Sequence, residues 1–264
     1  MHLLLTGQDK ELVEAVKGAL AALGFEKVID VDEERDEQAQ SRREDLQIHD
    51  ASPTLIVDVK GVAGLPADAG VLQADKHATI RMREWDRTNV LPVSIVNHQR
   101  HLPPLERENT TPFRKELFDH SEISHLAMMT TWDLFRLVRS FQKNSWKAEN
   151  VKPLFYQSAR IGIIPVNYEY LGRVAHVWTH AFSVILEGEE LCTGDRIAFE
   201  LPLGFEETLV ASLQVDDTGV GRAAVGTEVG IRTTPEPPNL KEGVRVFRVR
   251  QKRGANAVES TRSE

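Results

Sequence analysis

Three polar residues, Asp45, Asp58 and Lys60, fall on two neighbouring segments that the sequence predicts to be strands. Residues 44–49 alternate polar and apolar side chains, which is typical of a half-buried strand, and residues 54–60 are rich in β-branched residues. The turn residues at 50–53 make the two segments a predicted hairpin. Because alternate residues of a strand share a face, Asp58 and Lys60 point the same way, and we expect Asp45 to converge on them.

Two converging carboxylates repel each other unless a bound group offsets their charge. Mg²⁺ binds oxygen ligands at about 2.0–2.1 Å, commonly through one or two carboxylates plus waters and a substrate phosphate. Such an ion lowers the pKa of a bound water and stabilises charge on a phosphoryl group under in-line attack. We therefore expect Asp45 and Asp58 to hold Mg²⁺ or Mn²⁺, and Lys60 to orient or help deprotonate the water. The alternative is a solvated strand face with a surface salt bridge of about 0–1 kcal/mol.

The elements that must position these residues form a mixed series of helices and strands. Apolar residues at helical spacing predict a helix over 9–23, stopped by Gly24, and further helices over 71–85 and 113–118 and from an N-cap at Thr131. Strands are predicted at 27–31, 44–49, 54–60, 89–96 and 126–129, and the charged run 32–37 is a predicted solvated loop. This order predicts an α/β fold with a mixed sheet flanked by helices.

The segments Arg-Glu-Asp-Leu at 43–46 and Leu-Ile-Val-Asp-Val-Lys-Gly at 55–61 resemble the PD-(D/E)xK, or restriction-endonuclease-like, nuclease superfamily. The preceding helix, the hairpin that bears both acids and the following helix come in the family's order, and the resemblance covers about residues 7–145. It implies a restriction-endonuclease-like mixed sheet and a metal-dependent endonuclease, a hydrolase of phosphodiester bonds. Asp45, Asp58 and Lys60 match the family's two acids and lysine.

The same resemblance implies further site residues. The carbonyl of Val59 would join the metal ligands, and Gln73 matches the glutamine that many members place after the lysine strand, where it would bind the attacking water or a phosphate. The family often has an acid on the first helix; here Val13 falls at that place and Glu14 is adjacent, so Glu14 is a candidate ligand.

After residue 146 the sequence becomes polar, which predicts domains at 1–146 and 168–250, a linker at 147–167 and a disordered tail at 251–264. From Gly172 onward short apolar runs alternate with turn signals, which favours a small all-β barrel. The runs at 171–174, 187–197 and 224–231 resemble the β-barrel that follows the GTPase domain in translation factors. This resemblance implies contact with nucleic acid or a protein partner but no GTPase, since the chain has no phosphate-binding loop motif.

Composition limits the classes of protein further. The chain has 264 residues, 41% of them hydrophobic, a formal net charge of −8 and one cysteine, Cys192, which excludes collagen, a disordered chain and a disulfide scaffold. No apolar run reaches the length of a membrane span and no signal peptide is recognised, so we expect a cytoplasmic protein. The negative charge argues against indiscriminate coating of nucleic acid.

The expected function is a Mg²⁺-dependent nuclease that acts on nucleic acid, DNA rather than RNA, as a monomer or homodimer, with a protein partner on the barrel. Two alternatives stay open: a nuclease-fold protein that binds nucleic acid or protein without turnover, and a translation-associated or ribosome-binding factor. A zinc site is disfavoured, because His98 with His101 has no second ligand pair and His176 and His180 fall on predicted strands at unsuitable spacing. The basic residues Arg100, Arg107 and Arg114, and a second group at 245–253, are candidate phosphate-binding patches.

Overall fold

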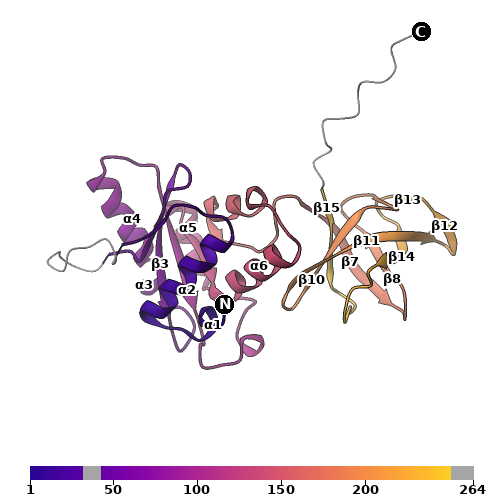
Figure 1. Cartoon of the computed structure of the whole chain (residues 1–264), viewed down its shortest axis with the longest axis horizontal. Helices are drawn as coiled ribbons and strands as arrows, with labels where there is room; N and C mark the ends of the chain where they lie inside the picture. Colours follow the sequence, from indigo (N-terminus) through magenta and orange to yellow (C-terminus); the bar gives the residue numbers. More distant parts are fainter. Residues whose placement is uncertain (32–42, 251–264) are drawn as a thin grey trace, which may run out of the picture. The chain divides into compact units, whose positions relative to one another are not determined.

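The computed structural model describes residues 1–31 and 43–250, which divide into two compact units (Figure 1). The first unit contains Met1–Val166 with Pro202–Gly204, and the second contains Asn167–Leu201 with the described residues from Phe205 onward. The predicted loop at 32–37 and the predicted tail at 251–264 lie outside the described residues.

The first unit is built on one six-stranded sheet with the strands in chain order, β1 to β6. Its strands are β1 (Val28–Asp30), β2 (Leu46–Ile48), β3 (Thr54–Gly61), β4 (Val90–Asn97), β5 (Ala127–Thr130) and β6 (Ala159–Arg160). β1, β2 and β3 pair antiparallel, and β3 to β6 pair parallel, so the sheet is mixed as the order of elements predicts. The predicted hairpin is confirmed, with Leu46 opposite Val57 and Ile48 opposite Leu55.

Helices cover both faces of this sheet. They are α1 (Leu3–Thr6), α2 (Asp9–Ala22), α3 (Asp68–Val71), α4 (Gln73–Glu84), α5 (Lys115–Ser124) and α6 (Thr131–Lys143), with a 3₁₀ helix η1 (Pro104–Glu106). On one face α4 packs on β3 and β4, where Ile56, Ala78 and Val90 form a buried cluster. α2 and α6 pack against each other and against the sheet.

Three local predictions need correction. The single helix expected over 71–85 is two helices that meet at Leu72, whose ψ of −5° ends α3 and leads into α4. The predicted short helix at 113–118 lies instead at Lys115–Ser124. The N-cap of α6 is Thr130 rather than Thr131: the Thr130 hydroxyl accepts a hydrogen bond from the Asp133 amide at 3.0 Å, and Thr131 is already helical.

Strand β2 is fully buried rather than half-buried. Its polar residue Gln47 is only 8% exposed, because α4 covers the face that the alternation assigned to solvent. The amide of Gln47 is satisfied there: its Nε2 donates to Glu44 Oε1 at 2.7 Å, and its Oε1 pairs with His49 Nε2 at 2.9 Å. The alternating pattern therefore predicted correctly which side chains share a face of β2. It was wrong in predicting that one of the two faces is exposed to solvent.

Residues 147–166 fold into the first unit instead of forming a polar linker. They contain the 3₁₀ helices η2 (Ala148–Asn150) and η3 (Lys152–Tyr156) and the sixth strand β6. Val151, Leu154 and Phe155 are buried, and the Phe155 ring packs edge-on against Phe25 with centroids 5.2 Å apart. The apolar residues that follow the polar start of this segment anchor it.

The second unit is a closed antiparallel barrel of six strands in the order β10-β15-β7-β8-β14-β11, with pairing of β10 to β11 closing the cylinder. Its strands are β7 (Tyr168–Val177), β8 (Phe182–Leu186), β9 (Leu191–Cys192), β10 (Arg196–Leu201), β11 (Gly204–Val215), β12 (Thr218–Val220), β13 (Arg222–Ala223), β14 (Glu228–Thr234) and β15 (Arg245–Val249). β9 and β13 form a separate two-stranded ribbon. The all-β barrel expected from the alternating runs and turns is confirmed.

One glycine shows how closely the barrel strands approach. Gly172 in β7 has φ +155°, and a Cβ atom built on it would lie 2.1 Å from the carbonyl oxygen of Ile185. Only glycine fits this position in the β7–β8 pair. The interior is apolar and includes Phe182 and Phe199, whose rings meet edge-on at 5.2 Å.

Candidate functional site

Strand β3 places Asp58 and Lys60 on the face of the sheet that α4 covers. Ile56, two residues earlier, packs against Ala78 of α4 on this face, and the alternation of β3 gives Asp58 and Lys60 the same direction. Asp58 is only 2% exposed, whereas Lys60 lies near the end of the strand and is partly exposed. A carboxylate buried this deeply requires partners that satisfy its charge.

His77 is the partner of Asp58. Its Nδ1 lies 3.0 Å from Oδ2 and 3.1 Å from Oδ1 of Asp58, and the imidazole is 4% exposed. Helix α4 positions the ring, because Ala74 and Ala78 bring the helix close to the sheet at this level. The buried Asp58 is thus held in one orientation by a side chain from the covering helix.

Asp45 lies alongside Asp58 on the neighbouring part of the hairpin. The chain bends at Asp45, just before β2, so that its amide donates to the carbonyl of Val57 at 3.1 Å. Its carboxylate Oδ2 accepts a hydrogen bond from the amide of Val59 at 2.7 Å. Asp45 therefore binds the β3 main chain on both sides of Asp58. The structure places the main chains of Asp45 and Asp58 next to each other on the hairpin, through a bend that strict alternation did not predict.

Lys60 and Gln73 lie at the α3–α4 end of the same face. The stem of Lys60 passes Gly70 of α3, where an added Cβ atom would lie 3.8 Å from Lys60 Cδ. Gln73 is the first residue of α4 and precedes His77 by about one helical turn, so both belong to one side of that helix. Lys60 and Gln73 are both partly exposed.

Glu44 and Arg81 form a second buried contact between the hairpin and α4. Glu44 is 1% exposed, and its Oε1 accepts from Arg81 Nε at 2.6 Å and from Gln47 Nε2 at 2.7 Å. Its second oxygen, Oε2, is buried without a hydrogen-bond partner among the described residues. Arg43 and Arg81 both pair with Glu84 at the end of α4. A row of polar residues on one face of α4 therefore contacts the acidic side of the hairpin.

Sequence reasoning missed His77, Glu44 and Arg81. For His77 and Arg81 the signal was their spacing from Gln73. The three residues follow one another at intervals of four, which places three polar side chains on one helical face. Ser94 of β4 was also missed: it is opposite Asp58 in the parallel register, fully buried, and its hydroxyl has no partner among the described residues. Asp58 therefore lies between a histidine and a strand that carries a further polar group.

One of the metal ligands expected from the sequence, Glu14, lies apart from the others. Glu14 is exposed on α2, and the structure gives it no contact with the hairpin acids. Among residues 1–31 and 43–250, no three His, Cys, Asp or Glu side chains are grouped as a metal site. The two aspartates nevertheless suit Mg²⁺, which binds proteins through one or two carboxylates and completes its shell with waters.

Two of the candidate phosphate-binding arginines, Arg107 and Arg248, have other roles, whereas Arg114 is exposed. Arg107 is 5% exposed and donates to the Asn97 side chain at 2.8 Å and to the Leu5 carbonyl at 2.7 Å, so it ties α1 to β4. Burial lowers the pKa of Arg107. In the barrel, Arg248 pairs with Glu169 and Glu189, and Lys252 and Arg253 lie outside the described residues. These buried or paired arginines are structural contacts rather than a free basic patch.

The remaining histidines and the cysteine form no metal centre in the described part of the chain. His98 is buried, its Nε2 lies 3.0 Å from the Glu108 carbonyl, and burial lowers its pKa. His176 and His180 each pair with a glutamate, Glu242 and Glu236. Cys192 is a free thiol. No described helix has the length and apolar character that crossing a bilayer requires.

Comparison with known proteins gives distant likenesses only. No family model matches the chain, and no curated protein does. Among solved structures, restriction endonuclease FokI aligns at TM-score 0.38 and 17% identity over 58% of this chain and 28% of that chain. Translation elongation factor SelB from Methanococcus maripaludis aligns at TM-score 0.27 and 11% identity, over 74% of this chain and 40% of that chain. The C-terminal domain of a protein assigned to the U32 peptidases, from Geobacillus thermoleovorans, aligns at TM-score 0.28 and 15% identity, over 31% of this chain and 93% of that domain.

Proposed function

We propose that the first unit is a metal-dependent nuclease that hydrolyses phosphodiester bonds of nucleic acid, with DNA as the preferred substrate. The observation that carries the proposal is the position of Asp45, which binds the β3 main chain on both sides of Asp58. These hydrogen bonds fix Asp45 against the β3 main chain next to Asp58, two residues before Lys60. Two aspartates on adjacent segments near a lysine are oxygen donors of the kind that Mg²⁺ binds, which supports a site for a divalent cation.

Asp45 and Asp58 would hold the metal, with the Val59 carbonyl as a further oxygen donor. When bound, Mg²⁺ or Mn²⁺ would lower the pKa of a water and offset the charge of the phosphoryl group. The Val59 amide holds the Asp45 carboxylate against β3, because it donates a hydrogen bond to Oδ2 at 2.7 Å. Glu14, which is exposed on α2, has no part in this proposal.

The other polar residues would act on the substrate and on the acids. Lys60, partly exposed at the end of β3, would bind a phosphate oxygen and orient the attacking water. Gln73, at the start of α4, would hydrogen-bond the same water or the adjacent phosphate. His77 would keep the Asp58 carboxylate in one orientation, as its contacts with both oxygens do here.

A cleavage assay tests this proposal. The full chain would be incubated with supercoiled DNA, linear DNA and single-stranded RNA, each with Mg²⁺, with Mn²⁺ and with a chelator. We expect metal-dependent cleavage of DNA that is lost in Asp58→Asn and in Lys60→Met, because each change removes a charge without altering the shape of the side chain much. Loss of a group that acts only in the transition state typically lowers the rate about 10²-fold or more.

The matched control is Asp86→Asn. Asp86 is exposed after α4 and has φ +49°, a conformation that asparagine also adopts readily, so this variant should fold and cleave like the parent. Cleavage that survives Asp58→Asn would show that the activity arises elsewhere or from a contaminant. No cleavage by the parent with either metal would contradict the proposal.

One observation favours a second candidate, a protein that binds nucleic acid through this fold without turnover. His77 lies within hydrogen-bond distance of both oxygens of Asp58, and this contact competes with a metal ion for the same lone pairs. Under this alternative the parent and Asp58→Asn bind labelled DNA equally in a gel-shift assay, and neither cleaves it. Metal-dependent cleavage by the parent alone would exclude it.

A further inference from the structure

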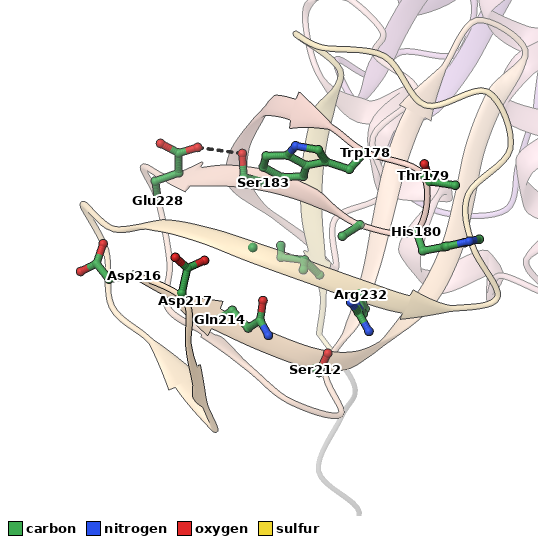
Figure 2. Close-up of a pocket in the computed structure, with 13 residues that line it drawn as sticks. Trp178, Thr179, His180, Ser183, Ser212, Gln214, Asp216, Asp217, Glu228 and Arg232 are labelled. Atoms are coloured by element: carbon green, nitrogen blue, oxygen red, sulfur yellow. Dashed lines mark hydrogen bonds between the residues drawn. The ribbon is translucent and has the colours of Figure 1, made fainter.

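The outer face of the barrel carries a hollow of about 600 Å³ between the turn after β7 and the turn after β11. Its floor is β14, and its two walls are β8 with Trp178 on one side and the end of β11 on the other (Figure 2). This volume falls within the range of about 300–1,000 Å³ that is typical of small-ligand sites.

A glycine opens the floor of the hollow. Gly230 lies between Ser183 of β8 and Gln214 of β11 in one cross-strand row. A Cβ atom at Gly230 would make only ordinary contacts, 3.6 Å to the Gln214 carbonyl oxygen, so packing of the barrel does not require glycine here. The small residues Ser183 and Gly230 therefore leave space beneath any side chain that enters between the walls.

One wall carries an exposed indole. Trp178 is 56% exposed in the four-residue turn between β7 and β8, where its amide donates to the Ala181 carbonyl at 2.8 Å. Figure 2 shows the ring near Ser183, with Glu228, the first residue of β14, on the other side of Ser183. The Ser183 hydroxyl donates to Glu228 Oε1 at 2.8 Å, which fixes that carboxylate. A large apolar ring left in solvent beside a fixed carboxylate is a common arrangement for binding a cation.

The charges around the hollow are unbalanced. Asp216, Asp217 and Glu228 contribute three carboxylates, against the single guanidinium of Arg232, while His180 is paired with Glu236. In the described structure, the side chains of Asp216 and Asp217 have no hydrogen bond or ion pair. The end of the hollow formed by Glu228 and the β11–β12 turn is therefore acidic.

We propose that this hollow binds a cationic side chain, arginine or lysine, from an extended basic segment of a protein partner. The cation would lie over Gly230, against the face of Trp178 and within reach of Asp217 and Glu228. Gln214 and Ser212 would hydrogen-bond the main chain of the same segment. The proposal is independent of the nuclease function proposed for the first unit.

The same charges argue against nucleic acid as the occupant. An aromatic ring could stack on a base, but the phosphates on either side would approach three carboxylates and a single arginine. A guanidinium gains from both features, because it stacks on the indole face and donates to carboxylates. The acidic end of the hollow therefore selects a basic peptide over a polyanion.

The test follows the indole N–H signals of the full chain by NMR. The chain has four tryptophans, and the Trp178 signal is assigned as the one absent from Trp178→Phe. The probes are acetyl-Gly-Arg-Gly-amide, the matched Glu tripeptide and a hexamer of deoxyadenylate. We expect a saturable shift of the Trp178 signal with the Arg tripeptide alone, and weaker binding, by about tenfold or more, in Asp217→Asn/Glu228→Gln.

These substitutions separate charge from folding. Asp216 and Asp217 have φ +48° and +59°, a conformation that asparagine also favours, and glutamine at 228 can still accept from Ser183. The matched control, Glu187→Gln, neutralises an exposed carboxylate that does not line the hollow and should leave the affinity unchanged. The proposal is overturned if the Arg tripeptide leaves the Trp178 signal unmoved, if the hexamer moves it instead, or if the double variant binds as the parent does.

Discussion

His77 Nδ1 of helix α4 lies 3.0 Å from Asp58 Oδ2 and 3.1 Å from Oδ1, so a single buried imidazole contacts both oxygens of a buried carboxylate. The contact connects the covering helix to the strand that carries the candidate site, and it makes the stability of the fold sensitive to the same residue that the proposed chemistry uses.

His77→Asn should therefore lower both stability and cleavage. Leaving a buried carboxylate without its partner costs about 1–3 kcal/mol of the free energy of unfolding, measured by urea denaturation. The control is His125→Asn: His125 is exposed with φ +56°, where asparagine is well tolerated, so a change within about 0.5 kcal/mol is expected. Equal stability of the two variants would show that the His77–Asp58 contact contributes little.

The Glu44–Arg81 pair should behave as a coupled buried pair. Arg81→Met leaves Glu44 charged and buried, which costs about 3–5 kcal/mol, whereas Glu44→Met/Arg81→Met removes both charges and should recover much of that loss. Chemical denaturation of the parent, both single variants and the double variant gives the coupling energy. If the stability loss of the double variant equals the sum of the losses of the two single variants, Glu44 and Arg81 are not energetically coupled and this interpretation is contradicted.

Two adjacent threonines at the start of α6 should differ in their effect. Thr130→Ala removes the N-cap bond to the Asp133 amide and should cost about 1 kcal/mol. Thr131→Val keeps the shape and removes a buried hydroxyl that has no partner among the described residues, so stability should be unchanged or higher. The melting temperatures of both variants measure this difference. A larger loss for Thr131→Val than for Thr130→Ala would indicate that Thr131 is the N-cap.

Asp50 should make stability depend on pH at the acid end. Burial alone raises the pKa of Asp50, but hydrogen bonds from Lys152 and from the Lys27 and Glu26 amides outweigh burial and hold this pKa below its usual range. A carboxylate with a depressed folded pKa stabilises the fold above its unfolded pKa, and this contribution is lost as pH falls through the folded value.

Asp50→Asn should therefore be less stable than the parent at neutral pH, and the difference should shrink as the pH falls below about 4. Urea denaturation of both proteins from pH 7 to pH 3 measures it. A difference that stays constant over this range would mean that the charge of Asp50 does not contribute.

The sequence predicted the elements of the first unit better than the contacts between them. The apolar spacing of α2 and the β-branched run of β3 were sufficient to predict a helix and a strand. Helix α2 buries one face, and β3 buries both faces over most of its length. The bend at Asp45 was not predictable, since it depends on main-chain bonds to Val57 and Val59 across the hairpin. The role of His77 likewise required knowing which strand α4 covers.

Residues 147–166 show a different limit. The prediction of a linker rested on the polar residues at the start of the segment and overlooked the apolar residues after them. The buried side chains that hold the segment in place are Val151, Leu154, Phe155, Ile161 and Ile163. Lys152 reinforces them by pairing with Asp50 at 2.6 Å, a contact between residues far apart in the chain. The candidate site residues Asp45, Asp58, Lys60 and Gln73 were found from motif and spacing, and their joint chemistry stays a prediction.

The short strand β6 determines where the first unit can be cut. Ala159 and Arg160 pair with Ala127 and Met128 of β5, and the Arg160 guanidinium also bonds Asp133 at 2.7 Å. A fragment that ended at Trp146 would lack β6 and would make β5 an edge strand with unpaired main-chain groups. Exposed edge strands of this kind pair with other chains and promote aggregation. Truncation studies should therefore retain the polypeptide beyond Arg160.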